Sequence, residues 1–442
     1  MRIVIVGAGA VGSYLAARLS SEGQDVVVIE SDERHAARLQ DRVDALVIVG
    51  NGASPITLEE AGIRKADLLI AVSDSDGANA LACHTARTMG VKRTVARIED
   101  QGLRSGLQGL GVDVVIDPGE MAAQEIVGLL GHSGVSDLVE FARGELVLVG
   151  GITRRRSPVV GKPLSELRKS TKWEWVVVAV VRHGQTIVAR GDTVIQEHDH
   201  VLLMTTKENL DEATEFMGVH QQPVRRAIVV GATRLAELTA DRLLQRGVDV
   251  VMVDQDADRC RTLAERHDRV LVLCADPTDP SVLEELGVSG KDAIVGLTGW
   301  DHVNALSCMV GKALGASTTV ARFNRISYVG LLGGTGIDAA VSARLAAANA
   351  ILRFVRRGRI HSVATFKDTD AEAIEIEVSP KSHAVGKVVS ELKLNTGAII
   401  GGIHREGDAL VPHGATEIHA RDRLTLFALP TAIHDVEKLF TG

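Results

Sequence analysis

Residues 3–12 read I-V-I-V-G-A-G-A-V-G, and residues 227–236 read A-I-V-V-G-A-T-R-L-A. Each stretch is an apolar run that ends at a glycine, Gly7 in the first and Gly231 in the second. The two glycines lie 224 residues apart (231 − 7), almost half of the 442-residue chain. A strand-length apolar run that closes on a glycine turn is typical of the first strand of a doubly wound parallel sheet. The repeat therefore predicts two such sheets in one chain.

The alternation around the first run supports this fold class. Strands are predicted at 3–6, 26–29, 46–49, 68–72, 94–98 and 112–116, and helices at 11–21, from 55 onward, at 76–89 and at 119–130. Six strands joined by short helical crossovers form a doubly wound parallel, Rossmann-like sheet. The same pattern restarts at Arg226 and runs to about Arg357.

A shorter, strand-rich module follows each of the two patterns. Residues 160–167 read V-G-K-P-L-S-E-L, and residues 385–392 read V-G-K-V-V-S-E-L. In the first module strands are predicted at 146–149, 176–181, 186–188 and 201–204. We therefore expect an α/β chain with two Rossmann-like domains, each followed by a small α+β domain. The predicted boundaries are 1–135, 136–220, 224–358 and 359–442.

Composition excludes several classes of protein. The chain has 57 acidic and 49 basic residues, a net charge of −8, and only 3% aromatic residues. Nucleic-acid binders need basic surface and stacking rings, so no nucleic-acid partner is expected. No apolar run approaches the ~18–20 residues of a membrane span, which predicts a soluble, cytoplasmic chain. The four cysteines form no C-x-x-C pair, and most are expected to be small buried thiols. They are Cys83, Cys260, Cys274 and Cys308.

The first glycine loop carries the strongest indication of a ligand. Gly7-x-Gly9-x-x-Gly12 follows a strand and opens a helix, with Ala10 and Val11 between the last two glycines. Gly7 permits the tight turn, Gly9 lets the backbone approach phosphates, and Gly12 permits close packing of helix on strand. The helix start then offers unpaired N–H groups to an anion. The pattern predicts a bound dinucleotide or nucleotide.

A carboxylate marks the end of the second predicted strand. Glu30 stands 18 residues after Gly12 (30 − 12). A carboxylate there accepts hydrogen bonds from ribose hydroxyls and repels a 2′-phosphate. NAD is therefore favoured over NADP.

Further candidates follow the other strand ends of the first sheet, where ligands bind in such folds. They are Asn51, Gly52 and Ala53 after the third strand, Ser73, Asp74 and Asn79 after the fourth, and Arg97 at the end of the fifth. Arg97 either reaches a phosphate or forms a surface ion pair, and the sequence leaves both alternatives open.

The second sheet keeps part of this set. Its candidates are Gly231, Asp254, Asp276, Thr298 and Arg322. Two glycines of the fingerprint are replaced, by Thr233 and Ala236, and a Cβ at position 233 intrudes where a pyrophosphate would approach. We expect the second site to bind more weakly than the first.

No catalytic constellation or metal-binding pattern is found, and the histidines of the small modules are interpreted as solvated loop residues. The duplicated sheet with one intact fingerprint favours a sensor or scaffold. The alternative is an NAD-dependent oxidoreductase with an unrecognised substrate domain.

Four motifs resemble the regulator-of-potassium-conductance (RCK, or KTN) domain. They are G-A-G-x-V-G at 7–12, N-G-A-S at 51–54, D-x-D-x-x-N at 74–79 and V-A-R-I at 95–98. The large–small–large–small order over the whole chain is similar to the TrkA family, the cytoplasmic regulatory subunits of Trk-type bacterial potassium uptake systems.

The resemblance implies a regulator without enzymatic activity. Such chains form a ring, typically a homotetramer, that docks on a membrane-embedded Trk-type potassium channel or transporter subunit at the inner face of the membrane. NAD(H), ATP or ADP acts as the regulatory ligand. Carried over by position, the residues lining the first site would be Gly7, Gly9, Gly12, Glu30, Ala53, Ser73, Asp74 and Arg97. Relatives often carry a second arginine two residues after the first, and this chain has Glu99 there, which weakens the expected contact to an ATP γ-phosphate.

Overall fold

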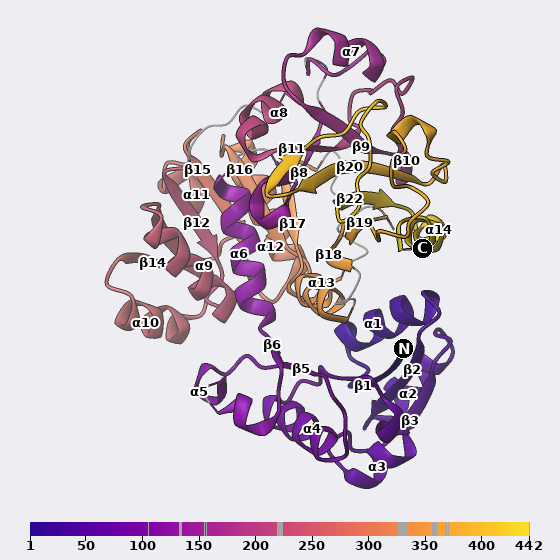
Figure 1. Cartoon of the computed structure of the whole chain (residues 1–442). Coiled ribbons are helices and arrows are strands. Elements are labelled where there is room, and N and C mark those ends of the chain that lie inside the picture. Colours follow the sequence, from indigo (N-terminus) through magenta and orange to yellow (C-terminus); the bar gives the residue numbers. More distant parts are fainter. Residues whose placement is uncertain are drawn as a thin grey trace. The chain divides into compact units, whose positions relative to one another are not determined.

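The computed structural model describes residues 1–441 except 105, 132–134, 154, 156, 219–223, 326–334, 356–359, 367–368 and 370 (Figure 1). The chain forms two compact units. One consists of Met1–Met121 with Ala343–Val355, and the other of Ala122–Ser342 with Arg356–Gly442. Among the described residues, no helix combines the length and the apolar character needed to cross a membrane.

The first unit is built on a six-stranded parallel sheet with the order β3-β2-β1-β4-β5-β6. The order reverses between β1 and β4, and at such a point the loops at the carboxyl ends of the strands part to form a crevice. The strands are β1 (Arg2–Val6), β2 (Asp25–Glu30), β3 (Leu46–Val49), β4 (Leu68–Ala71), β5 (Thr94–Arg97) and β6 (Val114–Ile116).

Helices cover both faces of this first sheet. Because successive side chains of a strand point to opposite faces, Ile3 and Ile5 of β1 join one core with Leu15 of α1. Val4 joins the opposite core with Cys83 of α4. This two-sided burial explains why the central strands read as uninterrupted apolar runs. The helices are α1 (Ala10–Ser21), α2 (Glu33–Gln40), α3 (Pro55–Glu60), α4 (Asp76–Thr88) and α5 (Gln101–Arg104).

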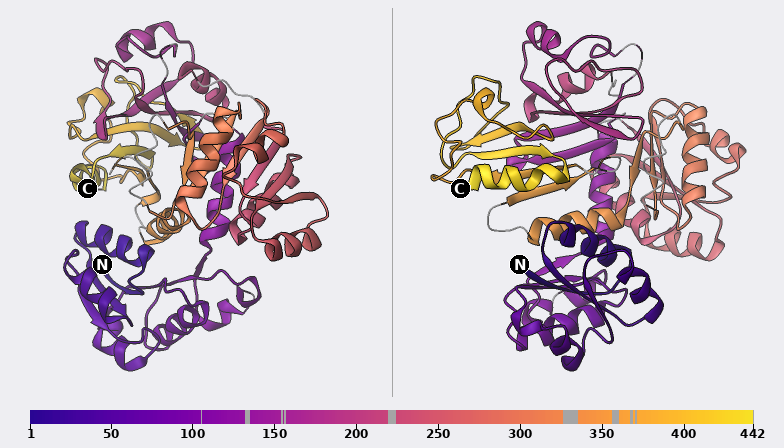
Figure 2. Two further views of the ribbon diagram at one scale, coloured as in Figure 1. Left: turned by 180° about the vertical axis from the view of Figure 1, so that it is seen from behind. Right: turned by 90° about the vertical axis from the view of Figure 1, so that its right-hand side faces the viewer.

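A helix from much later in the sequence completes the first unit. α13 (Ala343–Val355) lies beside α1, and its Ala347 and Ile351 are buried in the same core as Ile3 (Figures 1 and 2). Arg93 donates to the Phe354 carbonyl, and its guanidinium carbon lies 4.6 Å from the centre of the Phe354 ring. α13 therefore packs on the first sheet although it follows the last strand of the second.

The helix that follows the last strand of the first sheet passes from the first unit into the second. α6 (Pro118–Gly131) enters the second unit at Ala122. Arg246 next to α9 (Arg234–Gln245) donates from Nη1 to the Val127 carbonyl at 3.2 Å. The helix that follows the last strand of each parallel sheet thus belongs largely to the other unit.

The second unit contains a parallel sheet that repeats the first, in the order β14-β13-β12-β15-β16-β17. Its strands are β12 (Arg226–Val230), β13 (Asp249–Asp254), β14 (Val270–Cys274), β15 (Asp292–Gly296), β16 (Thr318–Arg322) and β17 (Ala339–Val341). Besides α9, the helices are α10 (Ala257–Arg266), α11 (Pro280–Glu285) and α12 (Asp301–Ala313).

Two small antiparallel sheets belong to the same second unit, in the orders β10-β9-β11-β8-β7 and β18-β19-β22-β20-β21. The first has β7 (Asp137–Phe141), β8 (Leu146–Ile152), α7 (Leu164–Ser170), β9 (Trp175–Arg182), β10 (Gln185–Val188), β11 (His200–Thr206) and α8 (Leu210–Phe216). The second has β18 (Ile360–Thr365), β19 (Glu372–Glu377), β20 (Ala398–Arg405), β21 (Asp408–Leu410), β22 (Arg423–Ala428) and α14 (Pro430–Thr441).

These small sheets pack face to face, as the right-hand view of Figure 2 shows. Phe141 and Met204 of the first sheet share one core with Phe366 and Phe427 from the second small module. Arg190 adds a polar contact, because its Nη2 donates to the Ala398 carbonyl at 2.9 Å. The two small domains therefore form a sandwich.

The same buried ion pair holds a turn in both small domains. Arg182 donates to both carboxylate oxygens of Asp199 at 2.8 and 2.7 Å, and Arg405 donates to Asp422 at the same two distances. The two aspartate side chains are only 2% and 1% exposed. The two small modules thus share this structural element as well as the repeated sequence at 160–167 and 385–392.

The predicted fold class is confirmed, with two Rossmann-like parallel sheets and a small α+β domain after each. β7 was not predicted, because Asp137 and Glu140 interrupt its apolar residues. Asp137 is nevertheless buried, 3.0 Å from His200. The boundaries predicted at residues 220 and 358–359 lie outside the described residues, as does residue 442.

Replacement of Arg182 by alanine should lower the free energy of unfolding by about 3–5 kcal/mol, because Asp199 would remain buried without its cation. Thermal or urea unfolding of the full chain measures this change. The matched control is Lys162→Ala, which removes a 3.5 Å ion pair with Glu166 whose two side chains are 60% and 61% exposed. That variant should change stability by less than about 1 kcal/mol, and equal effects of the two variants would contradict the account.

Candidate functional site

Two of the three loop glycines are required by the fold itself. Gly7 has a φ of +102°, and its N–H donates to the Ile29 carbonyl at 2.8 Å. A Cβ on Gly12 would lie 1.9 Å from the Gly7 oxygen. Larger residues are therefore excluded at both positions, and helix α1 starts directly against the turn.

Gly9 stands in open space. A Cβ at this position would meet no atom within 4 Å. Gly9 is the N-cap residue of α1, and no side chain caps this helix end. The backbone N–H groups of the first turn, including those of Ala10 and Val11, therefore have no intrahelical or side-chain partner at the positive end of the helix dipole. An anion such as phosphate fits this position.

The Glu30 carboxylate borders the same loop at the end of β2. One oxygen accepts from the Ala8 N–H at 2.5 Å, and the other accepts from the Asp32 N–H at 2.9 Å. Each carboxylate oxygen can accept a further hydrogen bond. Glu30 therefore keeps acceptor capacity beside the glycine loop.

The loops after β3 and β4 hold their candidates in different ways. Asn51 accepts from the Ala53 N–H at 2.9 Å in a local turn, and a Cβ on Gly52 would lie 2.2 Å from a methyl group of Val6. These residues shape the loop after β3 and keep it close to β1.

Asn79 is fully buried and clamps the loop that contains Ser73 and Asp74. Its Nδ2 donates to the carbonyls of Ser73 and Arg97, both at 2.9 Å. Its Oδ1 accepts from the Ser73 N–H at 2.9 Å and from the Ser73 hydroxyl at 2.7 Å. All hydrogen-bonding capacity of the amide is used within the protein, so Asn79 positions the loops after β4 and β5.

Arg97 forms ion pairs in this structure. Its Nε and Nη2 lie 3.0 and 2.5 Å from Glu99 Oε1, and its Nη1 lies 3.0 Å from Asp74 Oδ1. Burial alone would lower the pKa of Arg97, but the bonds to Glu99 and Asp74 raise it. Of the two alternatives left open by the sequence, the structure contains the ion pair.

The second sheet repeats much of this geometry. Gly231 has a φ of +107°, and Asp254 accepts from the Ala232 N–H at 2.6 Å and from the Asp256 N–H at 2.9 Å. Asn304 takes the place of Asn79, with hydrogen bonds to the Thr298 N–H, hydroxyl and carbonyl and to the Arg322 carbonyl.

The glycine loop itself differs at Thr233. The Thr233 hydroxyl accepts from the Ala236 N–H at 3.3 Å and donates to the Leu297 carbonyl at 2.9 Å. Helix α9 therefore carries its own side-chain cap, in contrast to α1. This cap satisfies a donor that a bound phosphate would otherwise use.

A cavity of about 930 Å³ opens at the strand ends of the second sheet, and we call it the second cavity. This volume is in the range of ligand pockets. Of the predicted residues, Asp254, Asp276 and Thr298 line it, whereas Gly231 and Arg322 are not part of its lining. The other lining residues are Thr233, Gln255, Asp256, Arg259, Pro277, Thr278, Gly299, Trp300, His302, Val303 and Leu306.

The second cavity is acidic with an aromatic rim. Hydrogen bonds from the Thr278 N–H and hydroxyl hold the pKa of Asp276 below its usual value, so this carboxylate is charged at neutral pH. Trp300 is 66% exposed, and its ring centre lies 6.2 Å from that of His302. Neither Trp300 nor His302 was identified as a site residue from the sequence. The available signal was that the second repeat has Trp300 at the position where the first repeat has Ser75.

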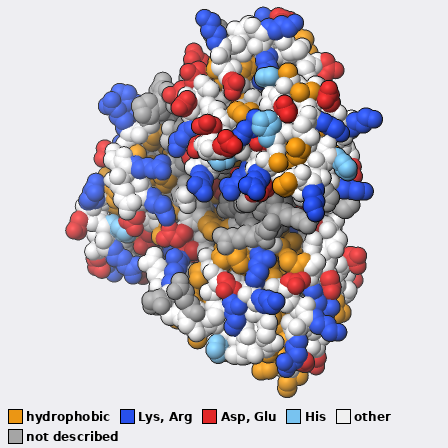
Figure 3. Space-filling model, viewed as in Figure 1, with side chains coloured by type: hydrophobic (Ala, Val, Ile, Leu, Met, Phe, Trp, Pro, Cys, Tyr) orange, Lys and Arg blue, Asp and Glu red, His pale blue; other side chains and the backbone are white. Residues whose placement is uncertain are grey.

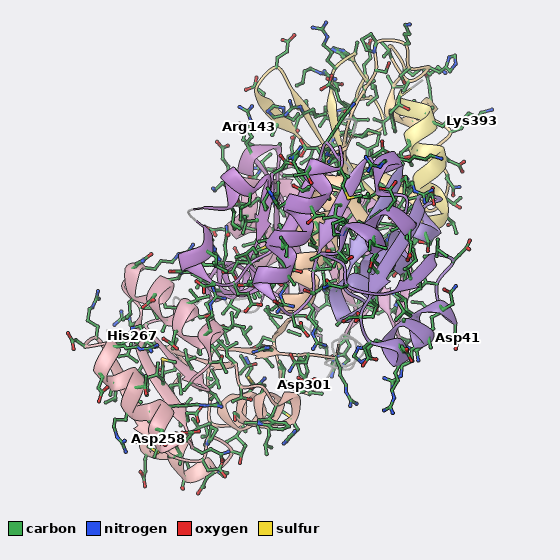
Figure 4. All side chains as sticks on the ribbon, turned by 90° about the horizontal axis from the view of Figure 1, so that it is seen from below. Asp41, Arg143, Asp258, His267, Asp301 and Lys393 are labelled. Carbon is green, nitrogen blue, oxygen red and sulfur yellow. The ribbon has the colours of Figure 1, made fainter. Side chains whose placement is uncertain are left out.

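Figure 4 labels Asp258 and Asp301, which lie in the first turns of α10 and α12. The starts of these two helices contribute Asp256, Arg259 and His302 to the cavity. On the face seen in Figure 3, acidic and basic side chains are interspersed, and no uniformly basic surface is visible. In the described part of the chain, no group of three or more His, Cys, Asp or Glu side chains is arranged to hold a metal ion.

Comparison with protein families matches two kinds of domain, each twice. The TrkA-N domain matches residues 3–118 and 227–343. The TrkA-C domain matches residues 155–218 and 373–441. The matches follow the order of the two parallel and two antiparallel sheets.

Curated relatives match the whole chain. A Trk system potassium uptake protein TrkA of Azorhizobium caulinodans is 34% identical over 451 residues, covering 100% of this chain and 98% of the relative. The protein of the same description from Halomonas elongata is 33% identical with the same coverage. A Trk system potassium uptake protein TrkA homolog 1 of Methanosarcina mazei is 33% identical and covered completely.

Solved structures with the same fold include two of GsuK. The GsuK channel bound to NAD has a TM-score of 0.61 at 20% identity, covering 99% of this chain and 78% of that chain. The GsuK RCK domain has a TM-score of 0.61 at 19% identity, covering 99% and 94%. At 19–20% sequence identity, these similarities show a shared fold.

Replacement of Asn79 by alanine should destabilise the first unit by about 2–4 kcal/mol, because it leaves the buried polar groups of Ser73 and Arg97 without partners. Thermal unfolding measures the loss. The control is Asp74→Ala in the same loop, whose side chain is 99% exposed and whose removal should change stability by less than about 1 kcal/mol. If Asn79→Ala were as stable as the unchanged protein, the clamp would not hold the loop.

Proposed function

The chain belongs to the TrkA family of Trk system potassium uptake proteins, and from this premise we propose that it is a nucleotide-responsive regulator of potassium uptake. One observation carries the nucleotide part of the proposal. The start of α1 is uncapped, and the position above Gly9 is open. The named relatives are potassium uptake proteins and not oxidoreductases, so the dehydrogenase alternative is set aside.

The proposed ligand of the first site is an adenine nucleotide, NAD(H), ADP or ATP. Its phosphates would lie on the α1 N-terminus at Gly7, Gly9 and Gly12, and its ribose would contact Glu30. GsuK, which shares the fold, has been solved bound to NAD and bound to ADP. The Glu99 carboxylate is hydrogen bonded to the Arg97 guanidinium. This pairing makes a contact between Arg97 and an ATP γ-phosphate less favourable. NAD(H) and ADP are therefore favoured over ATP.

The loops around the first site would complete the contacts. Ala10 and Val11 provide first-turn N–H groups, and Asn51, Gly52 and Ala53 form the wall after β3. Ser73, Asp74 and Arg97 border the opposite side, with Asn79 holding them in place. We assign these residues to ligand binding on their position at adjacent strand ends.

The second site would differ in affinity from the first. The Thr233 hydroxyl caps the start of α9 at the position where a phosphate would bind. Asp254, Asp276 and Thr298 line the second cavity. Gly231 shapes the turn, and Arg322 lies at the end of β16. Phosphate-rich nucleotides should therefore prefer the first site.

Self-assembly into a ring is part of the proposal. Leu81 of α4 is 52% exposed, and Leu306, at the corresponding position of α12, is 46% exposed. Exposed apolar residues on matching helices suit contacts between copies of the chain. A homotetramer presented in the cytoplasm to a membrane-embedded Trk-type potassium channel or transporter subunit fits the family.

The proposed mechanism is a coupling between nucleotide binding and ring shape. A ligand shifts an equilibrium between two shapes only through its different affinity for them, typically by ~1–3 kcal/mol per site. Equivalent sites in one ring add these contributions, so that a small preference at each site produces a steep response.

Gly9→Val should abolish nucleotide binding at the first site and leave the fold intact. The branched side chain would occupy the open space at the α1 start, where it meets no protein atom. Isothermal titration with NADH and ADP should show a loss of affinity of at least about tenfold, which is ~1.4 kcal/mol.

The matched control for this variant is Gly109→Val. A Cβ on Gly109 also meets no atom within 4 Å, but the residue lies in the 3-10 turn Leu107–Leu110, outside the glycine loop. The control should bind both ligands as the unchanged protein does. Unchanged binding by Gly9→Val would place the ligand elsewhere.

Potassium flux through the membrane subunit should depend on nucleotide when this protein is present. The measurement is flux in liposomes that contain the cognate membrane subunit, with and without NADH or ADP. Gly9→Val should remove the dependence while sedimentation shows an unchanged ring, because only the ligand site is altered. A nucleotide response that survives in this variant with its first site empty would contradict the proposed mechanism.

A further inference from the structure

Two thiols approach each other at the edge of the second parallel sheet, beside the second cavity. Cys260 lies in α10. Cys274 is the last residue of β14 and pairs with Asp254 of the neighbouring strand β13. Cys260 Sγ lies 3.2 Å from the Asp254 carbonyl oxygen and 3.9 Å from that of Leu273. Cys274 Sγ lies 3.9 Å from the carbonyl oxygen of Gln255. The two sulfur atoms therefore lie around one short stretch of backbone.

The two thiols differ in access. Cys274 is exposed, whereas Cys260 is 6% exposed. Burial and the neighbouring Cys274 side chain raise the pKa of Cys260 to about 11. This asymmetry gives the pair an outer thiol that a reagent reaches first and an inner thiol that cannot be reached directly.

The other two cysteines have no such arrangement. Cys83 and Cys308 are buried, and burial raises the pKa of each to about 12. They donate to backbone carbonyls within their cores. They serve as internal references, because both should remain thiols when the exposed pair reacts.

We propose that Cys274 and Cys260 form a reversible thiol–disulfide site for small disulfides of the glutathione type. The Cys274 thiolate attacks one sulfur of the small disulfide, forms a mixed disulfide and releases one thiolate, which takes the proton that Cys274 lost. Cys260 then attacks Cys274 Sγ, and its proton leaves with the second released thiol. The two cysteines are oxidised by two electrons, and one small disulfide is reduced to two thiols.

The reaction would alter the wall of the second cavity. The Cys260 thiol now donates to the backbone of Asp254, whose carboxylate lines the cavity. A disulfide removes this donor and ties α10 to the end of β14, two residues before Asp276. Figure 4 shows α10 between the labels Asp258 and His267. This consequence for ligand binding rests on the proposed nucleotide-binding function, whereas formation of the disulfide does not.

The test uses the full-length reduced protein and glutathione disulfide. After incubation the remaining thiols are alkylated under denaturing conditions, and peptides are mapped by mass spectrometry. The expected product is one intramolecular disulfide joining Cys260 and Cys274, with Cys83 and Cys308 alkylated, and a reducing agent should restore all four thiols. A mixed disulfide that persists on Cys274, or four alkylated cysteines, would overturn the proposal.

Two variants make the order of events visible. Cys260→Ser should stop at the mixed disulfide on Cys274, because no inner thiol resolves it. Cys274→Ser, at an exposed position where folding is not at risk, should not react at all. A glutathione adduct on Cys260 in that variant would reverse the assigned roles and overturn the proposal as stated.

The effect on the second cavity is measured separately, by ADP titration in a Gly9→Val background in which the first site is closed. Affinity should fall severalfold on oxidation, recover on reduction, and stay constant in Cys274→Ser. If the reduced protein bound no ADP, this result would contradict only the proposed second site, because peptide mapping detects the disulfide without any ligand. Equal affinity in both redox states would overturn the coupling between the thiol pair and the cavity.

Discussion

The contact between the Gly7 carbonyl and the start of helix α1 is the constraint on which the first site depends. A single Cβ on Gly12 would come within 1.9 Å of the Gly7 oxygen, so the helix can begin at the strand end only where side chains are absent. This close approach brings an uncapped helix start to the point where the strand order reverses, and an anionic ligand is the natural partner there. The second sheet has the same turn at Gly231, but Thr233 supplies its own cap.

Duplication explains why most of the remaining structure occurs twice with small differences. The buried amides of Asn79 and Asn304 make the same four bonds. The Arg182–Asp199 and Arg405–Asp422 pairs hold the two small domains in the same way. The two glycine loops differ, with a Thr233 cap on α9 and no side-chain cap on α1, because a duplicated fold must keep its core packing, whereas its loops are free to change.

The two parallel sheets and the small modules could be predicted from the sequence, since buried strands and amphipathic helices leave a local period in the chain. The placement of α6 and α13 could not, because a helix with one apolar face does not indicate which of two similar sheets it covers. Asn79 was predicted as a ligand-binding candidate, and its place after β4 could be predicted, but its buried bonds to Ser73 and Arg97 depend on how two loops meet. The Cys260–Cys274 pair and the Trp300 rim were missed for a related reason. Each arises from residues on adjacent elements that only the folded sheet brings together.

Hydrogen–deuterium exchange of the backbone amides of Ala10, Val11 and Gly12, with and without ADP, tests the central claim most directly. In the free protein these first-turn amides have no side-chain cap, so their exchange reports on a phosphate bound at the helix start. The account predicts slower exchange at these three amides when ADP is added, and little change at the corresponding start of α9. Unchanged exchange at residues 10–12 under conditions in which ADP is bound would contradict it.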